Sequence, residues 1–275
     1  MRAAAVQLTS TADRQRNLAT ADRLTRAAAA AGAELVVLPE KGAVLGTPEE
    51  TVAGAEPFDG PALAWASATA RELGIDLVAG SIAERVEGAE RGANTSVHFG
   101  PDGEEKAVYR KVHMFDVEVG GKTYRESAHE APGEEVVLSE TAGGVELGLS
   151  VCYDLRFPEL YRELAARGAR VIAVPAAFTL ATTREHWEVL LRARAIEDQA
   201  FVVAAGQAGK GVPPYESWGH SMVVSPWGTV LASTEEPGEA VVIADCDPAE
   251  RDRVRAEMPL LTSRRPETYP EGLRV

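Results

Sequence analysis

The sequence has little of several features that mark particular classes of protein. Only two of its 275 residues, Cys152 and Cys246, are cysteine, which is too few for a disulfide framework and lacks the spacing of a zinc ribbon. No run approaches the ~18 apolar residues of a membrane-spanning helix. The apolar N-terminal segment is too short for the core of a signal peptide. We therefore expect a cytoplasmic protein with reduced thiols.

Basic residues are also scarce. The chain has 28 Lys and Arg against 42 Asp and Glu, and its formal net charge is −14. A protein this acidic is repelled by nucleic-acid phosphates and by anionic membrane surfaces, so we expect neither as a partner. The net charge does not describe local fields, and a small anionic substrate at a locally basic site is still compatible with it.

Motifs for metal and nucleotide binding are missing as well. The five histidines form no H-x-x-x-H or H-E-x-x-H pair, and neither G-x-G-x-x-G nor G-x-x-x-x-G-K-[ST] occurs. Gly219-His220-Ser221 lacks the second glycine of a nucleophile elbow. We expect no metal and no cofactor, although a Cys–His pair with one of the histidines is conceivable.

The chain does contain an internal repeat in the order of its expected strands and helices. Each half shows the order strand, helix, strand, helix, strand and then a hairpin, with helices stopping at Gly and strands at Pro. Short runs such as LVVLP and VIAVP are typical of strands buried on both faces. The order predicts a duplicated α/β unit whose helices cover the sheets. The expected strands are 3–8, 34–39, 76–80, 94–99, 106–109, 145–151, 170–175, 201–205, 221–225 and 229–233, and the expected helices are 13–31, 61–73, 158–167 and 184–198.

Three residues with reactive side chains each follow an expected strand. Cys152, Glu40 and Lys111 all hold this position, and sites in α/β sheets form at the carboxyl ends of strands. Taken singly, each has a plainer interpretation: a small buried hydrophobe, a helix cap and a solvated lysine. Taken together, a thiol, a carboxylate and an ammonium form a complete catalytic set.

The chemistry of this set is nucleophilic attack on a carbonyl. A thiol is scarcely ionised at neutral pH, so a base must take its proton, and Glu40 can do this. Lys111 and the backbone N–H of Tyr153 could then stabilise the negative charge on the carbonyl oxygen. Glu40 would return the proton to the departing nitrogen and later activate water. Cys246, between two aspartates, is expected to be inert.

At these residues the sequence resembles the nitrilase superfamily. Leu38-Pro39-Glu40 is similar to the family's glutamate motif and Tyr109-Arg110-Lys111-Val112-His113 to its lysine motif. The stretch SVCYDLRFPE (150–159) is similar to its cysteine motif. HWEVLLRARAIEDQ (186–199) and GHSMVVSPWGTVLA (219–232) resemble a narrower group of omega-amidases and amidases acting on deaminated glutathione.

The resemblance implies a four-layer α-β-β-α sandwich, internally duplicated, in one domain over residues 1–275. It implies at least a homodimer, and the tail from about 259 is expected to pack on the domain or on a partner subunit. It also implies a second glutamate that supports the lysine, and Glu126 matches that position. Lys41 departs from the pattern, because relatives usually carry a smaller or less charged residue there.

Further residues are expected to shape a substrate pocket, because they follow catalytic positions or strand ends. Arg184 is a candidate for binding a substrate carboxylate, whereas Arg156 is expected to form a structural pair, such as with Glu159. The segment 210–218 gives no indication of the substrate. The expected pocket residues are Phe115, Tyr153, Ala176, Ala177 and Phe178.

The leading hypothesis is hydrolysis of a small linear amide, such as the omega-amide of a 2-oxo acid or deaminated glutathione. Nitrile hydrolysis and N-carbamoyl amino acid hydrolysis are alternatives within the same fold. From other classes, an N-acyltransferase or a non-catalytic binding protein would also have to be considered. The acyltransferase is disfavoured because such relatives usually carry a membrane or lipid-handling portion. The full set of catalytic residue types argues against a non-catalytic protein.

Overall fold

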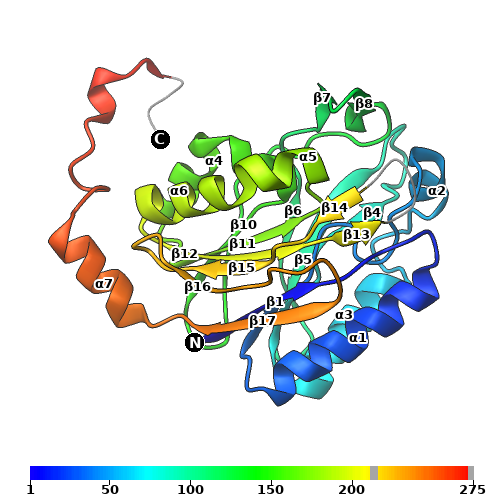
Figure 1. Cartoon of the computed structure of the whole chain (residues 1–275), viewed down its shortest axis with the longest axis horizontal. Helices are drawn as coiled ribbons and strands as arrows, with labels where there is room; N and C mark the ends of the chain where they lie inside the picture. Colours follow the sequence, from blue (N-terminus) through cyan, green and yellow to red (C-terminus); the bar gives the residue numbers. More distant parts are fainter. Residues whose placement is uncertain (211–215, 272–275) are drawn as a thin grey trace.

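The computed structural model describes residues 1–210 and 216–271 of the chain (Figure 1). Residues 211–215 of the segment 210–218, and the last four residues of the tail, lie outside the described residues.

Two mixed sheets form the centre of the molecule. The first has the strand order β17-β1-β2-β3-β5-β4, with β6 paired to β5, and the second has the order β16-β15-β12-β11-β10-β9. The first contains β1 (Arg2–Gln7), β2 (Leu35–Val37), β3 (Asp76–Val78), β4 (Ile82–Glu84), β5 (Ala93–Phe99), β6 (Glu105–Arg110) and β17 (Ala240–Asp245). The second contains β9 (Leu138–Glu140), β10 (Glu146–Leu149), β11 (Val171–Ala176), β12 (Phe201–Gly206), β15 (Met222–Val224) and β16 (Val230–Ser233).

Helices cover the outer face of each sheet. Figure 1 shows α1 (Arg14–Ala30) and α3 (Pro61–Leu73) against the first sheet, and α4 (Pro158–Ala166) and α6 (Glu188–Asp198) against the second. Helix α3 begins with proline at its first position and ends at Gly74, whose left-handed backbone (φ 65°) closes the helix. The parallel pairs β1–β2, β2–β3, β10–β11 and β11–β12 follow from the helical crossovers between these strands.

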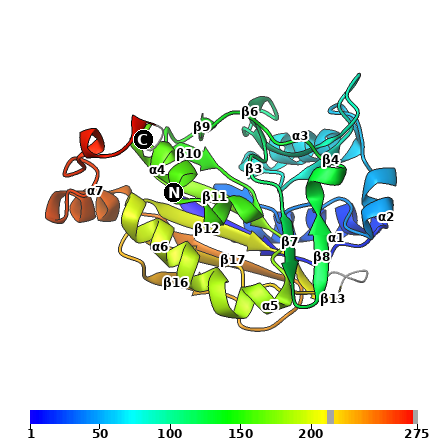
Figure 2. The same ribbon diagram turned by 90° about the horizontal axis from the view of Figure 1, so that it is seen from above.

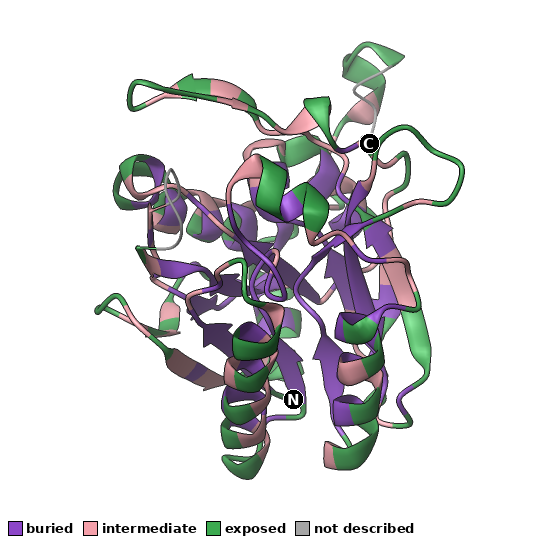
Figure 3. Cartoon of the chain, turned by 90° about the vertical axis from the view of Figure 1, so that its right-hand side faces the viewer, coloured by how far each residue is buried: buried purple, intermediate pink, exposed green. Residues whose placement is uncertain are grey.

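Residue alternation along β1 explains the layering. Ala3 and Ala5 belong to a core shared with the second sheet, whereas Ala4 and Val6 belong to a core shared with α1 and α3. Side chains on a strand point alternately to the two faces, so a strand buried on both faces must be apolar throughout. Figure 3 shows the central strands buried and the outer faces of the helices exposed. The α-β-β-α sandwich and its repeated order are therefore confirmed.

Several elements were not predicted from the sequence. The C-terminal strand β17 pairs antiparallel with β1, with Arg2 opposite Asp245, and completes the first sheet. The helix predicted from residue 184 begins earlier in the structure, because α5 (Leu180–Thr182) and the π-helical η3 (Thr183–Trp187) lead directly into α6. Other elements not predicted are the strands β4 and β9, and α2 (Pro48–Ala53), β7 (Asp116–Val119), β8 (Lys122–Arg125), η1 (Glu126–Ala128), β13 (Ala208–Lys210), β14 (Glu216–Trp218), η2 (Cys152–Arg156), α5 (Leu180–Thr182), η3 (Thr183–Trp187), α7 (Pro248–Glu257) and η4 (Pro266–Thr268).

After β17 the chain continues into α7, which still contacts the sandwich: Val254 is buried, and the carbonyls of Val254 and Met258 accept hydrogen bonds from the Gln199 amide. Figures 1 and 2 show the segment that follows α7 extending away from the four layers. Most of residues 259–271 are exposed. Within the described residues, no helix combines the length and apolar character that crossing a membrane requires.

Candidate active site

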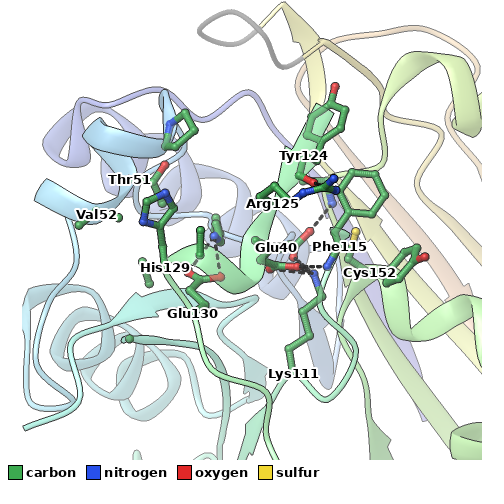
Figure 4. A pocket seen from close by; sticks show the side chains of 18 of the residues that line it. Glu40, Thr51, Val52, Lys111, Phe115, Tyr124, Arg125, His129, Glu130 and Cys152 are labelled. Atoms are coloured by element: carbon green, nitrogen blue, oxygen red, sulfur yellow. Dashed lines mark hydrogen bonds and ion pairs between the residues drawn. The ribbon is translucent and has the colours of Figure 1, made fainter. Parts of the chain in front are cut away.

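The loops that follow β2, β6 and β10 meet at one cavity. Glu40 lies in the loop after β2, Lys111 directly follows β6, and Cys152 begins η2 after β10. All three side chains line a cavity of about 620 Å³. Figure 4 shows the Glu40 carboxylate and the Lys111 ammonium together, with the Cys152 sulfur beside them.

Cys152 has an unusual backbone conformation. Its φ angle is 51°, in the left-handed region that non-glycine residues rarely adopt. The sharp turn from β10 into η2 requires this conformation, and the side chain is only 8% exposed. Strained residues of this kind persist where surrounding contacts hold them, and they cluster at functional sites.

Asp154 supplies contacts that hold this turn. Its fully buried carboxylate accepts hydrogen bonds from the Val151 N–H (2.9 Å), the Tyr109 hydroxyl (2.7 Å) and the His113 N–H (3.0 Å). The His113 ring, stacked on Phe157, lies 2.7 Å from the same carboxylate through Nδ1. These contacts join the turn that bears Cys152 to the segment that follows Lys111.

Lys111 is held between two carboxylates. Its ammonium donates to Glu40 Oε1 (3.0 Å) and to both oxygens of Glu126 (3.0 and 2.8 Å). The remaining Glu40 oxygen accepts the backbone N–H of Ala177 (2.9 Å), and Glu126 accepts the N–H of Phe115 (2.6 Å). Glu126 thus contacts Lys111 as the sequence resemblance implied.

Asn94 is a site residue that the sequence analysis missed. Its amide nitrogen donates to Glu40 Oε1 (2.8 Å) and to Glu126 Oε1 (3.0 Å), so it bridges the two carboxylates. Its backbone carbonyl also accepts the N–H of Lys111 (2.9 Å). The only signal was a run of polar residues inside the expected strand 94–99, because the pairing of β5 with β6 that aligns it with Lys111 is not local.

The charges of this cluster follow from burial and from near neighbours. Burial works to lower the pKa of Lys111, but Glu126 and Glu40 outweigh it and hold that pKa well above its usual value. Burial works to raise the pKa of Glu126, but Lys111 and then Lys41 hold it at about 2. Burial, and then the Glu40 carboxylate, raise the pKa of the Cys152 thiol despite the opposing charge of Lys111. The resting site therefore contains a neutral Cys152 thiol beside the ionised Glu126 carboxylate and the Lys111 ammonium.

Most of the expected pocket residues line the cavity, but two do not. Phe115, Tyr153, Ala177 and Phe178 are lining residues. Ala176 is fully buried in β11 and is not one of them. Arg184 is not one of them either. Its guanidinium instead lies 4.3 Å from the centroid of the Trp218 ring.

Arg156, rather than Arg184, is the arginine that lines the cavity near Cys152 and Tyr153. Its guanidinium lies over the rings of Phe178 (5.2 Å to the centroid) and Tyr153 (5.9 Å), and 3.1 Å from His186 Nδ1. The expected pair with Glu159 does not form in the described part of the chain, where Arg156 has no carboxylate within ion-pair distance.

Lys41 also faces the cavity and forms an ion pair with Glu130, at 2.9 and 3.0 Å.

The second cysteine, Cys246, lies outside the cavity, directly after β17, where burial raises its pKa to about 12. Among residues 1–210 and 216–271, no group of three or more His, Cys, Asp or Glu side chains could hold a metal ion.

Comparisons with known proteins find relatives over almost the whole chain. Residues 2–256 match the family model described as carbon-nitrogen hydrolase. The chain is 42% identical over 268 residues to the deaminated glutathione amidase of Synechocystis, covering 95% of this chain and 97% of that protein. It is 39% identical to the chloroplastic omega-amidase of Arabidopsis thaliana, covering 96% and 72% respectively. The crystal structure of Saccharomyces cerevisiae Nit3, a member of branch 10 of the nitrilase superfamily, superimposes with a TM-score of 0.87 at 32% identity, and 96% of each chain is covered.

Proposed function

Since the chain belongs to the carbon–nitrogen hydrolase family of the nitrilase superfamily and is an amidase acting on non-peptide bonds, we propose that Cys152 is its nucleophile. One observation carries this assignment. Cys152, Glu40 and Lys111 are far apart in the sequence, yet their side chains line the same part of one cavity.

The first half of the reaction forms an acyl-thioester. Glu40 takes the thiol proton as Sγ attacks the amide carbonyl carbon, because the raised pKa of Cys152 leaves the free thiol protonated. The negative charge that develops on the carbonyl oxygen is stabilised by the Lys111 ammonium and by the N–H of Tyr153, in the first turn of η2. The C–N bond then breaks, and Glu40 gives its proton to the departing nitrogen.

The second half releases the acid. Water replaces the amine, Glu40 removes a proton from it, and the resulting hydroxide attacks the thioester carbonyl. The C–S bond breaks, the thiolate regains the proton held by Glu40, and the free enzyme returns. Glu126 acts on Lys111 and not on substrate, since it keeps the ammonium charged and fixed through two short hydrogen bonds.

The acyl group is proposed to carry a carboxylate of its own. Arg156 presents a guanidinium on the cavity wall that has no carboxylate partner among the described residues, and two aromatic rings orient it. A guanidinium binds carboxylate in a planar two-point geometry. This supports the monoamide of a dicarboxylic acid, including the omega-amide of a 2-oxo acid or deaminated glutathione, and two of the relatives are named deaminated glutathione amidase and omega-amidase. Arg156 takes the role first considered for Arg184.

A substrate panel tests this function. The panel comprises 2-oxo acid omega-amides, simple aliphatic amides, nitriles and N-carbamoyl amino acids, with release of ammonia or amine as the readout. We expect turnover of the carboxylate-bearing amides, and Arg156→Gln should raise their KM at least tenfold while changing the KM of a neutral amide little. Turnover of nitriles or carbamoyl compounds alone would contradict the proposed substrate class.

We further propose that the chain works as a homodimer in the cytoplasm. Val189 and Ile196 of α6 expose large apolar side chains, as does Trp227, whose neighbour Gly228 accepts a hydrogen bond from Arg192 of the same helix. Figure 1 shows the tail after α7 extending away from its own sandwich. Both features suit a partner subunit, and a nucleophilic thiol suits a reducing compartment. Sedimentation of the full chain and of a chain ending at residue 258 tests the dimer, and a monomeric full chain would contradict it.

A further inference from the structure

Three arginines lie together at the edge of the second sheet that is opposite the catalytic residues. Cys152 and Ala177 follow the carboxyl ends of the parallel strands β10 and β11, whereas Arg170 directly precedes β11. Arg251 and Arg255 lie four residues apart on α7, so they share one face of that helix. Figure 1 shows α7 at the end of the molecule away from the β7–β8 hairpin. We call Arg170, Arg251 and Arg255 the arginine cluster.

Two of these guanidinium groups have a buried donor without an acceptor. Arg251 is only 5% exposed, and its Nε and that of Arg255 are buried with no hydrogen-bond partner among the described residues. Their other contacts are long: Arg251 Nη2 lies 3.5 Å from the carbonyl oxygen of Ala169, the residue before Arg170, and Arg255 Nη2 lies 3.5 Å from that of Asp198. Buried N–H groups in folded proteins almost always have an acceptor. The two arginines are therefore suited to a ligand that supplies oxygen atoms.

The acids near the arginine cluster compensate its charge only in part. Asp252 lies 3.5 Å from Arg251, but the side chain of Asp252 is 63% exposed, and an ion pair with an exposed partner contributes little. Glu146 lies 2.8 Å from Arg170. Arg255 forms no ion pair with any residue that the structure describes. Three guanidinium groups thus share two carboxylates, and one of these carboxylates is largely in solvent.

A third carboxylate, that of Asp198, is engaged elsewhere. It is fully buried and forms an ion pair with Arg162 at 3.1 Å. Burial raises the pKa of Asp198 to about 7 despite the charge of Arg162. At neutral pH this carboxylate therefore carries only part of a negative charge, so it neither neutralises Arg255 nor strongly repels an anion beside it.

The pKa values of the arginines show the same imbalance. Burial, and then the charges of Arg255 and Arg170, lower the pKa of Arg251 to about 10. Burial, and then Arg170, also lower the pKa of Arg255. By contrast, hydrogen bonds to the carboxylate of Glu84 raise the pKa of Arg110. In the arginine cluster, burial and mutual repulsion therefore outweigh the attraction of the surrounding acids, and an anion among the three guanidinium groups would offset both.

From this arrangement we infer that the arginine cluster is a second binding site, separate from the catalytic cavity, for a phosphate ion or the phosphoryl group of a small metabolite. Guanidinium groups bind phosphate oxygens through paired N–H donors. A phosphoryl group carries about −1.5 to −2 charge at neutral pH and three acceptor oxygens, which suits three arginines better than a monocarboxylate does. The side chain of Arg170 is 36% exposed, so the ligand reaches the cluster from that side. Once bound, it ties α7 to the start of β11.

Thermal unfolding of the full chain measures this binding. Sodium phosphate replaces sodium chloride stepwise, from 0 to 50 mM phosphate, at constant ionic strength and pH 7.5. A ligand that binds only the folded protein stabilises it by mass action, and we expect the Tm of the wild type to rise by about 3 °C or more. A wild-type Tm that is the same in phosphate and in chloride overturns the inference.

Variants then assign the effect to the arginine cluster. In chloride, Arg251→Leu should be at least as stable as the wild type, because it replaces a poorly paired buried charge with an apolar side chain. In phosphate it should show less than a third of the wild-type rise in Tm, as should Arg170→Gln at a half-buried position. A merely structural role would lower the Tm equally in both salts. Arg253→Leu removes one charge from the exposed face of α7 and should keep the full rise. Equal rises in Arg251→Leu and in the wild type overturn the inference.

Two further ligands identify the chemistry of the site. Stabilisation by glycerol 3-phosphate as well as by phosphate supports a phosphoryl group on a larger metabolite, and stabilisation by phosphate alone supports the free ion. Equal stabilisation by glutarate, a dicarboxylate, would contradict the assignment to phosphate. None of the three arginines lines the catalytic cavity, so Arg251→Leu in chloride should hydrolyse amides within twofold of the wild-type rate. A greater loss would show that the cluster is not separate from the active site.

Discussion

The ammonium of Lys41 is bound by both carboxylate oxygens of Glu130, at 2.9 and 3.0 Å, in a buried pair beside the catalytic cluster. Burial works to lower the pKa of Lys41, but Glu130, Glu126 and Glu40 raise it, so the side chain stays charged. Together with Lys111 it places two positive charges among three carboxylates. Lys41 is the residue that departed from the family pattern in the sequence, and the structure shows it balancing the charge of the site.

Replacing Lys41 should move the acid limb of the pH profile. In Lys41→Met, Glu126 and Glu130 lose a favourable charge, so their pKa values rise. Glu126 must be ionised to hold Lys111, and we expect the acid limb of kcat/KM to shift upward by roughly one pH unit. Lys41→Arg keeps the charge and should shift the limb much less. An acid limb that is the same in Lys41→Met and wild type would contradict this role.

The depressed pKa of Glu126 also predicts a pH dependence of stability. Its value of about 2 in the folded protein lies below the ordinary value of 4.5, so ionised Glu126 stabilises the fold. This contribution is complete above about pH 4.5 and is lost as the pH falls towards 2. Urea unfolding of wild type and Glu126→Gln between pH 3 and pH 6 measures it. The variant should show a weaker dependence on pH, and parallel curves would contradict the assignment.

Asn94 should matter for rate more than for substrate affinity. Asn94→Ala removes the amide that bridges Glu40 and Glu126, and a hydrogen bond to a charged group contributes about 1.5–3 kcal/mol. We expect kcat to fall about 10- to 100-fold with little change in KM. Asn94→Asp, which adds a third carboxylate at this point, should be worse. Steady-state kinetics measure kcat and KM, and circular dichroism checks that each variant is folded. An unchanged kcat in Asn94→Ala would show that catalysis does not need the Asn94 amide between Glu40 and Glu126.

The backbone conformation of Cys152 predicts that stability and activity oppose each other at this residue. A left-handed conformation costs a non-glycine residue about 1–2 kcal/mol, and glycine avoids most of this cost. Cys152→Gly and Cys152→Ala should both be inactive. The glycine variant should have the higher free energy of unfolding, by about 1 kcal/mol, despite the greater flexibility of its unfolded chain. If the alanine variant is the more stable, the turn is not strained.

The layers and the three strand-end residues could be predicted because they depend on local patterns. Strands buried on both faces are apolar throughout, and helices end at glycine. The repeated order of strands and helices in the two halves could therefore be recognised in the sequence. Glu40, Lys111 and Cys152 follow such strands directly. The catalytic roles of these residues remain predictions that the experiments above address.

What the sequence could not provide are contacts between distant segments. Strand β17 pairs with β1 across more than 230 residues, and no local pattern specifies that partner. Asn94 looked like one polar residue among several until the pairing of β5 with β6 placed it beside Lys111. Which arginine could bind a substrate carboxylate depends on whether the side chain of Arg156 or of Arg184 faces the cavity. The sequence does not specify this, because it depends on how distant segments pack.

The most direct test of the account is mass spectrometry of the protein quenched with acid during turnover of a carboxylate-bearing amide. Hydrolysis of the thioester removes the acyl group from Cys152, so the sample is quenched before deacylation is complete and digested at once. We predict a peptide containing residue 152 whose mass is increased by the acyl group, and no such peptide in Glu40→Gln or Cys152→Ala. Continued turnover by Cys152→Ala, or an acyl group found only on Cys246, would contradict the claim that the thiol, the carboxylate and the ammonium act together in this cavity.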